Sequence, residues 1–143
     1  MADRKTFSVS LVTPDGAAWE GEAEMLIVPG AAGEIGVLAR HAPLVAMLKA
    51  GSTRIYRNRA SEDIVTFATG PGFFKVEQDR ALALVDDAVD AQHIDPARAR
   101  EQLEAARGEL ERVEQGELDA DRWQLEQRIK HAENQLSVSG HST

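Results

Sequence analysis

The sequence predicts an α+β protein in which an N-terminal antiparallel β-sandwich is followed by a C-terminal antiparallel α-helical hairpin. Between Phe7 and Val89, short apolar and β-branched runs alternate with Gly, Pro and Asp turn signals, which is typical of an all-β unit. After Asp90, long polar segments carry apolar residues at intervals of three and four. The 143 residues, 43% of them hydrophobic, suffice for one compact domain and a smaller appendage. We therefore divide the chain into a head, residues 1–90, and a hairpin with its tail, residues 91–143.

The first half of the chain contains eight runs that read as strands. Turn residues such as Pro14-Asp15-Gly16 and Gly70-Pro71-Gly72 separate them at close spacing. Many short antiparallel strands of this kind favour a sandwich or a flattened barrel. The predicted strands are Phe7–Thr13, Ala18–Glu24, Met25–Val28, Val37–Leu38, Thr53–Arg57, Ile64–Thr69, Phe73–Glu77 and Arg80–Val85.

The first helix is predicted to begin at Pro96, with Asp95 as its N-cap, because Pro suits the first helical position and Asp accepts from free amides. Gly116 is suited to end it. One face of this helix is apolar and the others are charged. The residues of the apolar stripe are Ala99, Leu103, Ala106, Leu110 and Val113.

A second helix follows, for which Asp119 is the predicted N-cap. Its apolar stripe repeats the same spacing, and the short connection makes the two helices antiparallel neighbours with a narrow seam. Because most of the hairpin surface is charged, we expect the hairpin to dock weakly on the sandwich and to be able to detach. The tail from Ser137 to Thr143 is expected to be disordered. The second stripe consists of Leu125, Ile129, Ala132 and Leu136.

Charge and composition exclude several classes of partner. A net charge of −8 argues against nucleic acid and against direct insertion into acidic lipid. No segment reaches the roughly 20 apolar residues of a membrane span, and the first ten residues lack the plan of a signal peptide. We therefore expect a cytosolic protein unless a partner holds it elsewhere. The chain has no cysteine, which excludes disulfides and thiolate chemistry.

Catalytic constellations are not found in the sequence, and we predict neither an enzyme nor a metal site. The four histidines lack metal-ligand spacing. The segment Pro29–Gly36 resembles a phosphate loop only in its glycines, lacks the Gly-Lys-Ser/Thr end, and is interpreted as a loop with positive φ. Asp86 and Asp87 are adjacent in the chain, so in a strand they would point to opposite faces, and no Gly-x-Ser-x-Gly elbow is present.

An ordered set of loop motifs resembles the epsilon subunits of bacterial-type ATP synthases, over about Phe7 to Val138. The resemblance implies a β-sandwich of about ten strands and two helices. It also implies a non-catalytic rotor subunit that couples proton flow to ATP synthesis. The motifs are Leu11-Val12-Thr13-Pro14, Trp19-Glu20-Gly21-Glu22-Ala23, Val28-Pro29-Gly30, Gly33-Glu34-Ile35-Gly36-Val37-Leu38, His41-Ala42-Pro43-Leu44, Leu48-Lys49-Ala50-Gly51, Gly72-Phe73-Phe74-Lys75-Val76 and Ile94-Asp95-Pro96-Ala97-Arg98-Ala99.

The resemblance further implies the partners and the place of work. These are the γ shaft, the membrane ring of c subunits and the α/β catalytic head, at the cytoplasmic face of a bacterial inner membrane. By position, Glu34 in its Gly-rich turn and His41 would contact the c-ring; the alternative is that both are simply exposed. Leu44, Val45 and Met47 belong either to the γ interface or to the core, and the sequence does not separate these two.

In the resembled family the hairpin either folds against the sandwich or extends into the catalytic head and inhibits ATP hydrolysis. Some members bind ATP at the hairpin through a motif that stands here as Ile94, Asp95, Arg98 and Ala99. Further arginines of that site are replaced in this chain by Ala105, His131 and Gln135, so the phosphates would have fewer donors. The alternative interpretation is that Asp95 is only an N-cap and Arg98 a solvated helix residue.

Two other classes of function remain as alternatives. The first is a free adaptor or chaperone-like protein that inserts its hairpin into another complex. The second is a small β-sandwich hydrolase, which would need a pocket with convergent titratable groups.

Overall fold

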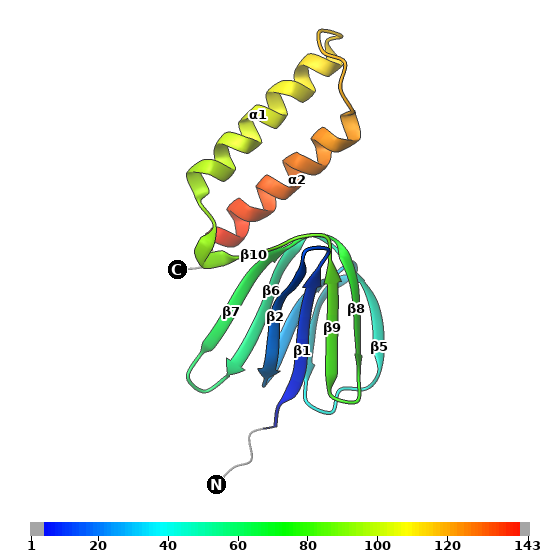
Figure 1. Ribbon diagram of the computed structural model, residues 1–143, viewed down its shortest axis with the longest axis vertical. Coiled ribbons are helices and arrows are strands. Elements are labelled where there is room, and N and C mark those ends of the chain that lie inside the picture. Colours follow the sequence, from blue (N-terminus) through cyan, green and yellow to red (C-terminus); the bar gives the residue numbers. More distant parts are fainter. Residues whose placement is uncertain (1–4, 141–143) are drawn as a thin grey trace.

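The computed structural model describes residues 5–140 and confirms a β-sandwich followed by two helices (Figure 1). The elements are β1 Phe7–Thr13, β2 Gly16–Ala23, β3 Met25–Gly30, β4 Gly33–Leu38, β5 Leu44–Leu48, β6 Gly51–Asn58, β7 Asp63–Thr69, β8 Gly72–Glu77, β9 Arg80–Val85, β10 Ala88–Asp90, the 3₁₀ helix η1 Ala91–His93, α1 Pro96–Glu114 and α2 Arg122–Ser139.

The ten strands form one continuous sheet that folds over itself into two layers (Figure 1). The strand order is β10-β7-β6-β3-β5-β8-β9-β1-β2, and β4 pairs with β3 beside this path. All pairs are antiparallel except β1 with β9, which run parallel. The helical hairpin stands at the end of the sandwich where β7 and β9 finish, and β1 begins at the opposite end (Figure 1).

The eight predicted strands are all present, but two observed strands were missed. β5 consists of five apolar residues with no alternation and no branched run, so its sequence does not distinguish a strand from core coil. β10 has only three residues and follows two aspartates. The predicted loop Pro29–Gly36 is in fact a tight hairpin: Ala31 and Ala32 form the turn, and β4 already begins at Gly33, whose φ is +143°.

The core of the sandwich is made by the inward face of each strand. In β1, for example, Phe7, Val9 and Leu11 are buried while the residues between them face outward. Phe74 of β8 and Ile55 of β6 belong to the same core cluster and have no exposed surface. The remaining core residues are Ala23, Leu26, Val28, Val37, Leu48, Phe67, Val76, Ala81, Ala83 and Val85.

The start and end of α1 agree with the predicted caps. The Asp95 carboxylate accepts hydrogen bonds from the amides of Ala97 at 3.0 Å and Arg98 at 3.3 Å. Pro96 occupies the first turn. After Glu114, Gly116 adopts a left-handed φ of +76°, which a residue with a side chain would reach only with strain.

Two predictions about α2 are wrong. Its N-cap is Asp121 and not Asp119, because the amides of Glu117 and Leu118 both bond the Arg112 carbonyl and thus extend the connection around the end of α1. The tail was expected to be disordered from Ser137 onward. Instead α2 continues through Ser139, and Val138 is 2% exposed. The rest of that prediction, residues 141–143, lies outside the described residues.

Candidate functional site

An exposed apolar row crosses three neighbouring strands of the sandwich. Met47 of β5 lies directly opposite Phe73 of β8, and Phe73 lies opposite Leu84 of β9. The three side chains are 64%, 36% and 42% exposed, respectively. Val45, two residues before Met47 and on the same side of β5, is 60% exposed. We call Val45, Met47, Phe73 and Leu84 the apolar face.

The alternation of β5 separates the three residues predicted for the shaft contact. Leu44 is half-buried and packs against the sandwich core, whereas Val45 and Met47 point outward. Sequence reasoning missed the other half of the apolar face, Phe73 and Leu84. A signal was present, because consecutive phenylalanines in one strand must point to opposite faces, so a buried Phe74 requires an outward Phe73.

Glu34 and His41 are not brought together by the fold. Glu34 is the second residue of β4 and lies opposite Pro29, so its predicted position in a turn is wrong. Its carboxylate pairs with the Arg54 guanidinium, with 2.7 Å between Oε2 and Nη2. His41 comes after the other end of β4, in the connection to β5.

The His41 loop is held by short polar contacts. The amide of Arg40 donates to the Asp79 carboxylate in the β8–β9 turn, at 2.6 Å. The His41 ring nitrogen Nδ1 lies 2.6 Å from the carbonyl of Ala42, to which it can donate. Arg40 has a left-handed φ of 65°, which fixes the direction of the chain before His41. The side chain of His41 is half-buried.

A cavity of about 720 Å³ lies between the hairpin and the end of the sandwich. All four residues predicted to bind nucleotide, Ile94, Asp95, Arg98 and Ala99, line this cavity. Helix α2 closes its other side. The further lining residues that carry charge or can titrate are Asp86, Asp87, His93, Arg128, Lys130 and His131.

Several polar groups of this cavity already have partners within the protein. The Asp95 carboxylate caps α1, and the Nη1 of Arg128 pairs with Glu109 at 3.2 Å. His131 and Gln135, which stand where the resembled site has arginines, contact each other at 2.8 Å. Ala105, the third replacement, offers no side-chain donor. The lining residues with a positively charged side chain are Arg98, Lys130 and Arg128, and Arg128 would have to leave Glu109 to bind a triphosphate.

One carboxyl of the cavity has a shifted pKa. Burial raises the pKa of Asp86 above its usual 3.8, and the negative charge of Asp87 raises it further. The nearby His131 lowers the pKa of Asp86 and so offsets part of this rise. The Asp86 carboxylate also lies directly over the backbone of Gly70, where any larger residue would collide with it. A side chain at position 70 would thus displace Asp86.

The hairpin meets the sandwich through few contacts. The Asn134 amide donates to the carbonyls of Gly51 at 3.3 Å and Thr69 at 3.1 Å. His131 Nε2 lies 3.4 Å from the Asp87 carboxylate. The apolar part is a small cluster whose buried members are Ala68, Ala91, Ile94 and Val138.

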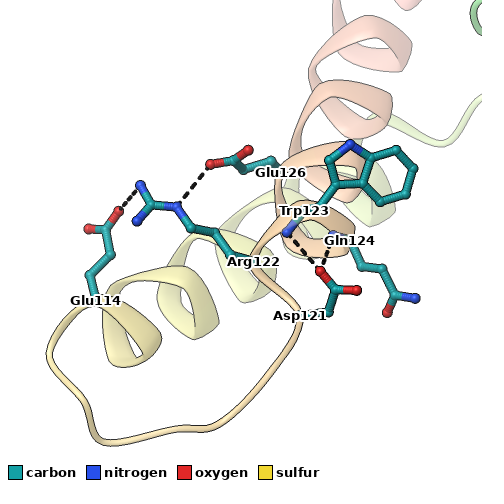
Figure 2. Close-up of polar contacts among 6 residues, drawn as sticks. All are labelled: Glu114, Asp121, Arg122, Trp123, Gln124 and Glu126. Atoms are coloured by element: carbon teal, nitrogen blue, oxygen red, sulfur yellow. Dashed lines mark hydrogen bonds and ion pairs between the residues drawn. The ribbon is translucent and has the colours of Figure 1, made fainter.

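The far end of the hairpin presents an exposed tryptophan. Figure 2 shows Arg122 between Glu114 and Glu126, with contacts of 3.0 and 3.1 Å, and Asp121 capping α2 through the amides of Trp123 and Gln124. The Trp123 indole points away from these ion pairs and is 65% exposed (Figure 2). An exposed Trp at the end of a charged hairpin is a candidate anchor for a partner.

Two kinds of site are not found in residues 5–140. No group of three or more His, Asp or Glu side chains there could hold a metal ion. Neither helix combines the length and the apolar character that crossing a membrane requires.

Comparisons with known proteins agree on one family. The model for the β-sandwich domain of the ATP synthase delta/epsilon chain matches residues 6–91. The ATP synthase epsilon chain of Bacillus cytotoxicus is 40% identical over 94% of this chain and 97% of its own length. That of Acaryochloris marina is 34% identical over 94% of this chain and 96% of its own.

Solved structures give the same fold. A chain of the Euglena gracilis mitochondrial ATP synthase, in a structure of OSCP, F1 and c-ring, superposes with a TM-score of 0.74. It is 21% identical, and the match covers 94% of this chain and 81% of that one. A chain of the Tetrahymena thermophila ATP synthase central stalk and c-ring has a TM-score of 0.55 at 14% identity and covers 99% of each chain.

Proposed function

Because this chain belongs to the epsilon-chain family of ATP synthase, whose members are stalk subunits and not the catalytic one, we propose that it works as a rotor subunit. In this role it links rotation of the membrane ring to ATP synthesis in the catalytic head. Family membership over nearly the whole chain also displaces the free adaptor and the hydrolase as explanations of the sequence.

The observation that carries this proposal is the apolar face of Val45, Met47, Phe73 and Leu84. Contiguous apolar side chains on a monomer mark a contact surface, because their exposure to water is unfavourable. We propose that the γ shaft covers this face. The central strand β8 is held in register by ladders to β5 on one side and to β9 on the other, so the face is presented as a rigid surface.

The contact with the c-ring is proposed to run along β4. Glu34 and His41 lie at opposite ends of β4. A flat ring surface that touches both residues must therefore lie along the whole strand. β4 pairs only with β3 among the described strands, and Glu34, Gly36 and Leu38 are exposed. This proposal predicts that Gly36, between the two, also lies against the ring.

The hairpin is proposed to leave the sandwich and inhibit ATP hydrolysis in the catalytic head. Its support is the small docking cluster, the charged exterior and the exposed Trp123 at the far end. An extended hairpin would lose few contacts and could offer Trp123 to a new partner. Binding of ATP in the cavity is proposed to be weak, since the phosphates would compete with Glu109 for Arg128 and face Asp86 and Asp87.

A binding experiment with matched variants tests the shaft contact. Leu84 and Leu38 are 42% and 46% exposed, but Leu84 belongs to the apolar face, whereas Leu38 lies on β4, which pairs with β3. We expect Leu84→Asp to lower the affinity for the γ subunit at least ten-fold, which corresponds to about 1.4 kcal/mol of binding free energy. Co-elution with γ in size-exclusion chromatography measures this loss. Leu38→Asp should bind γ as the unaltered chain does.

A truncation after Asp90 separates the two parts of the proposal. If the sandwich carries the shaft contact, the full chain and the truncated chain both co-elute with γ. Failure of both to bind would remove the rotor assignment, whereas failure of the truncated chain alone would move the contact to the hairpin. Equal loss in Leu84→Asp and Leu38→Asp would show that the apolar face is not the γ surface.

A further inference from the structure

One ring nitrogen at the hairpin–sandwich junction has two neighbours with opposite requirements. His131 Nε2 lies 2.8 Å from the Gln135 amide nitrogen on the same helix and 3.4 Å from the Asp87 carboxylate on the β9–β10 connection. An amide nitrogen can only donate a hydrogen bond, and a carboxylate can only accept one. The ring can therefore satisfy only one of them at a time.

The proton on His131 decides which neighbour is satisfied. A neutral ring with a bare Nε2 accepts from Gln135, and this bond lies within α2 and contributes nothing to docking. A charged ring carries a proton on Nε2 and donates to Asp87, which is a contact between hairpin and sandwich. Protonation thus replaces a contact within the hairpin by one across the junction.

We propose that His131 and Asp87 form a proton-operated latch that holds the hairpin on the sandwich more tightly as the pH falls below neutrality. The chain can then respond to acidification without any ligand.

The other charged groups around the ring do not reverse this direction. Asp86 and Asp87 face it from the β9–β10 connection, and His93, Asp95 and Arg98 line the same cavity from η1 and the start of α1. Arg128 and Lys130 are on its own helix, and Arg128 is occupied by Glu109. Asp86 lies beside Asp87 in the same connection, and its carboxylate sits against the backbone of Gly70 on the sandwich side.

Asn134 provides a part of the junction that does not depend on pH. Its amide reaches two backbone carbonyls of the sandwich and carries no titrating group. Loss of Asn134 should weaken docking equally at every pH. Loss of His131 should remove the pH dependence, and this difference separates the latch from simple packing.

The absence of cysteine allows the opening of the junction to be measured in the full chain. Val138→Cys places a thiol that is covered only while the hairpin is docked, since Val138 is 2% exposed. Its reaction rate with a thiol reagent, divided by that of a Ser61→Cys chain at the same pH, gives the opening equilibrium. Ser61 lies in the exposed β6–β7 turn at the opposite end, and Ala68→Cys, on the sandwich side of the junction, is the second probe.

We expect the relative rate to fall about two- to five-fold from pH 8 to pH 6, the range for a solvent-exposed ion pair. His131→Gln should make it independent of pH, and Asp87→Asn should reduce the slope. His41→Gln, at the other end of the sandwich, should keep the full slope, and Asn134→Ala should raise the rate at both pH values. A flat profile in the unaltered background, or an unchanged slope in His131→Gln, would overturn the latch.

The consequence for the complex rests on the proposed function. If the extended hairpin inhibits hydrolysis, acidification would favour the docked and non-inhibiting form. The thiol experiment uses the isolated chain, so its failure would remove the latch and leave the rotor assignment untouched, while failure to bind γ would leave the latch untouched.

Discussion

The sandwich and the hairpin junction bury very different side chains. Inside the sandwich, Phe7, Leu11 and Phe74 are at most 2% exposed and touch residues from several strands. At the junction, by contrast, the buried cluster holds only two alanines, one isoleucine and one valine. A fully buried Phe or Leu contributes about 1.5–3 kcal/mol, while an alanine methyl contributes less than about 1 kcal/mol.

The contrast indicates that the two parts have separate tasks. The sandwich contains a core of fully buried side chains, and its paired strands present the apolar face as a rigid surface. The hairpin has an internal seam, formed mainly by Ala99, Leu103 and Ala106 against Leu125 and Ala132, and only a loose attachment. A loosely attached element can change position at a cost of a few kcal/mol, so a proton or a partner is able to move it.

The largest effect is expected in the sandwich core. Phe74→Ala should lower the free energy of unfolding by about 3–5 kcal/mol, because it removes a fully buried ring and leaves a cavity. Urea denaturation measures this loss. Phe73→Ala is the matched control, since Phe73 is the adjacent residue and points outward; it should cost less than about 1 kcal/mol. Similar losses in both would contradict the division into core and apolar face.

A smaller and more local effect is expected in the seam. Leu125→Ala should cost the hairpin about 2–3 kcal/mol, since Leu125 is buried between the two helices. The helical circular dichroism should then be lost at lower urea than the fluorescence of Trp19, which packs on the sandwich core, measured in a Trp123→Phe background. A single transition shared by both signals would show that the hairpin and the sandwich unfold as one unit.

The caps of α2 distinguish the observed structure from the sequence-based prediction. Asp121→Ala should destabilise the hairpin by about 1 kcal/mol, because two amides lose their acceptor. Asp119→Ala should change stability by less than about 0.5 kcal/mol, as expected for an exposed loop residue. Helical circular dichroism during thermal unfolding checks both. A larger loss of stability in Asp119→Ala than in Asp121→Ala would show that Asp119 is the N-cap, as the sequence predicted.

The smallest effect concerns Asp86 and depends on pH. Its pKa is raised in the folded chain, so its contribution to stability is present below the usual value of 3.8 and is lost as the pH rises through the folded value. Relative to the unaltered chain, Asp86→Asn should therefore gain stability as the pH rises from below to above the usual value of 3.8.

Urea denaturation at several pH values across this range measures the gain. Asp119→Asn, which removes the same charge from the hairpin loop, is the control. Loss of stability in Asp86→Asn with rising pH would mean that the carboxylate is stabilised in the folded chain by a partner.

Local chemistry made much of the fold predictable. Asp95 with Pro96 and Gly116 mark both ends of α1 because caps act through neighbouring backbone groups, and the sequence contains all of them. Strand alternation predicted most of the sandwich. The two missed strands are those without a local signal: β5 is uniformly apolar, and β10 is three residues long and exists through its pairing with β7.

The candidate sites were less predictable, because each needs residues from distant parts of the chain. Ile94, Asp95, Arg98 and Ala99 do line one cavity, as their spacing on a helix start allows, but Asp86 and His131 reach it from elements that the sequence does not place. Glu34 and His41 are only seven positions apart, yet an extended strand separates them.

Neighbouring residues and motifs in a fixed order were enough to predict the two-part architecture, the caps of α1, the apolar seam and the family. The tertiary structure alone decided which apolar side chains of β5, β8 and β9 form one exposed row, that Val138 fastens the end of α2, and that His131 meets Asp87. These three results depend on strand register and on the packing of one part against the other, and neither is encoded in any short stretch of the chain.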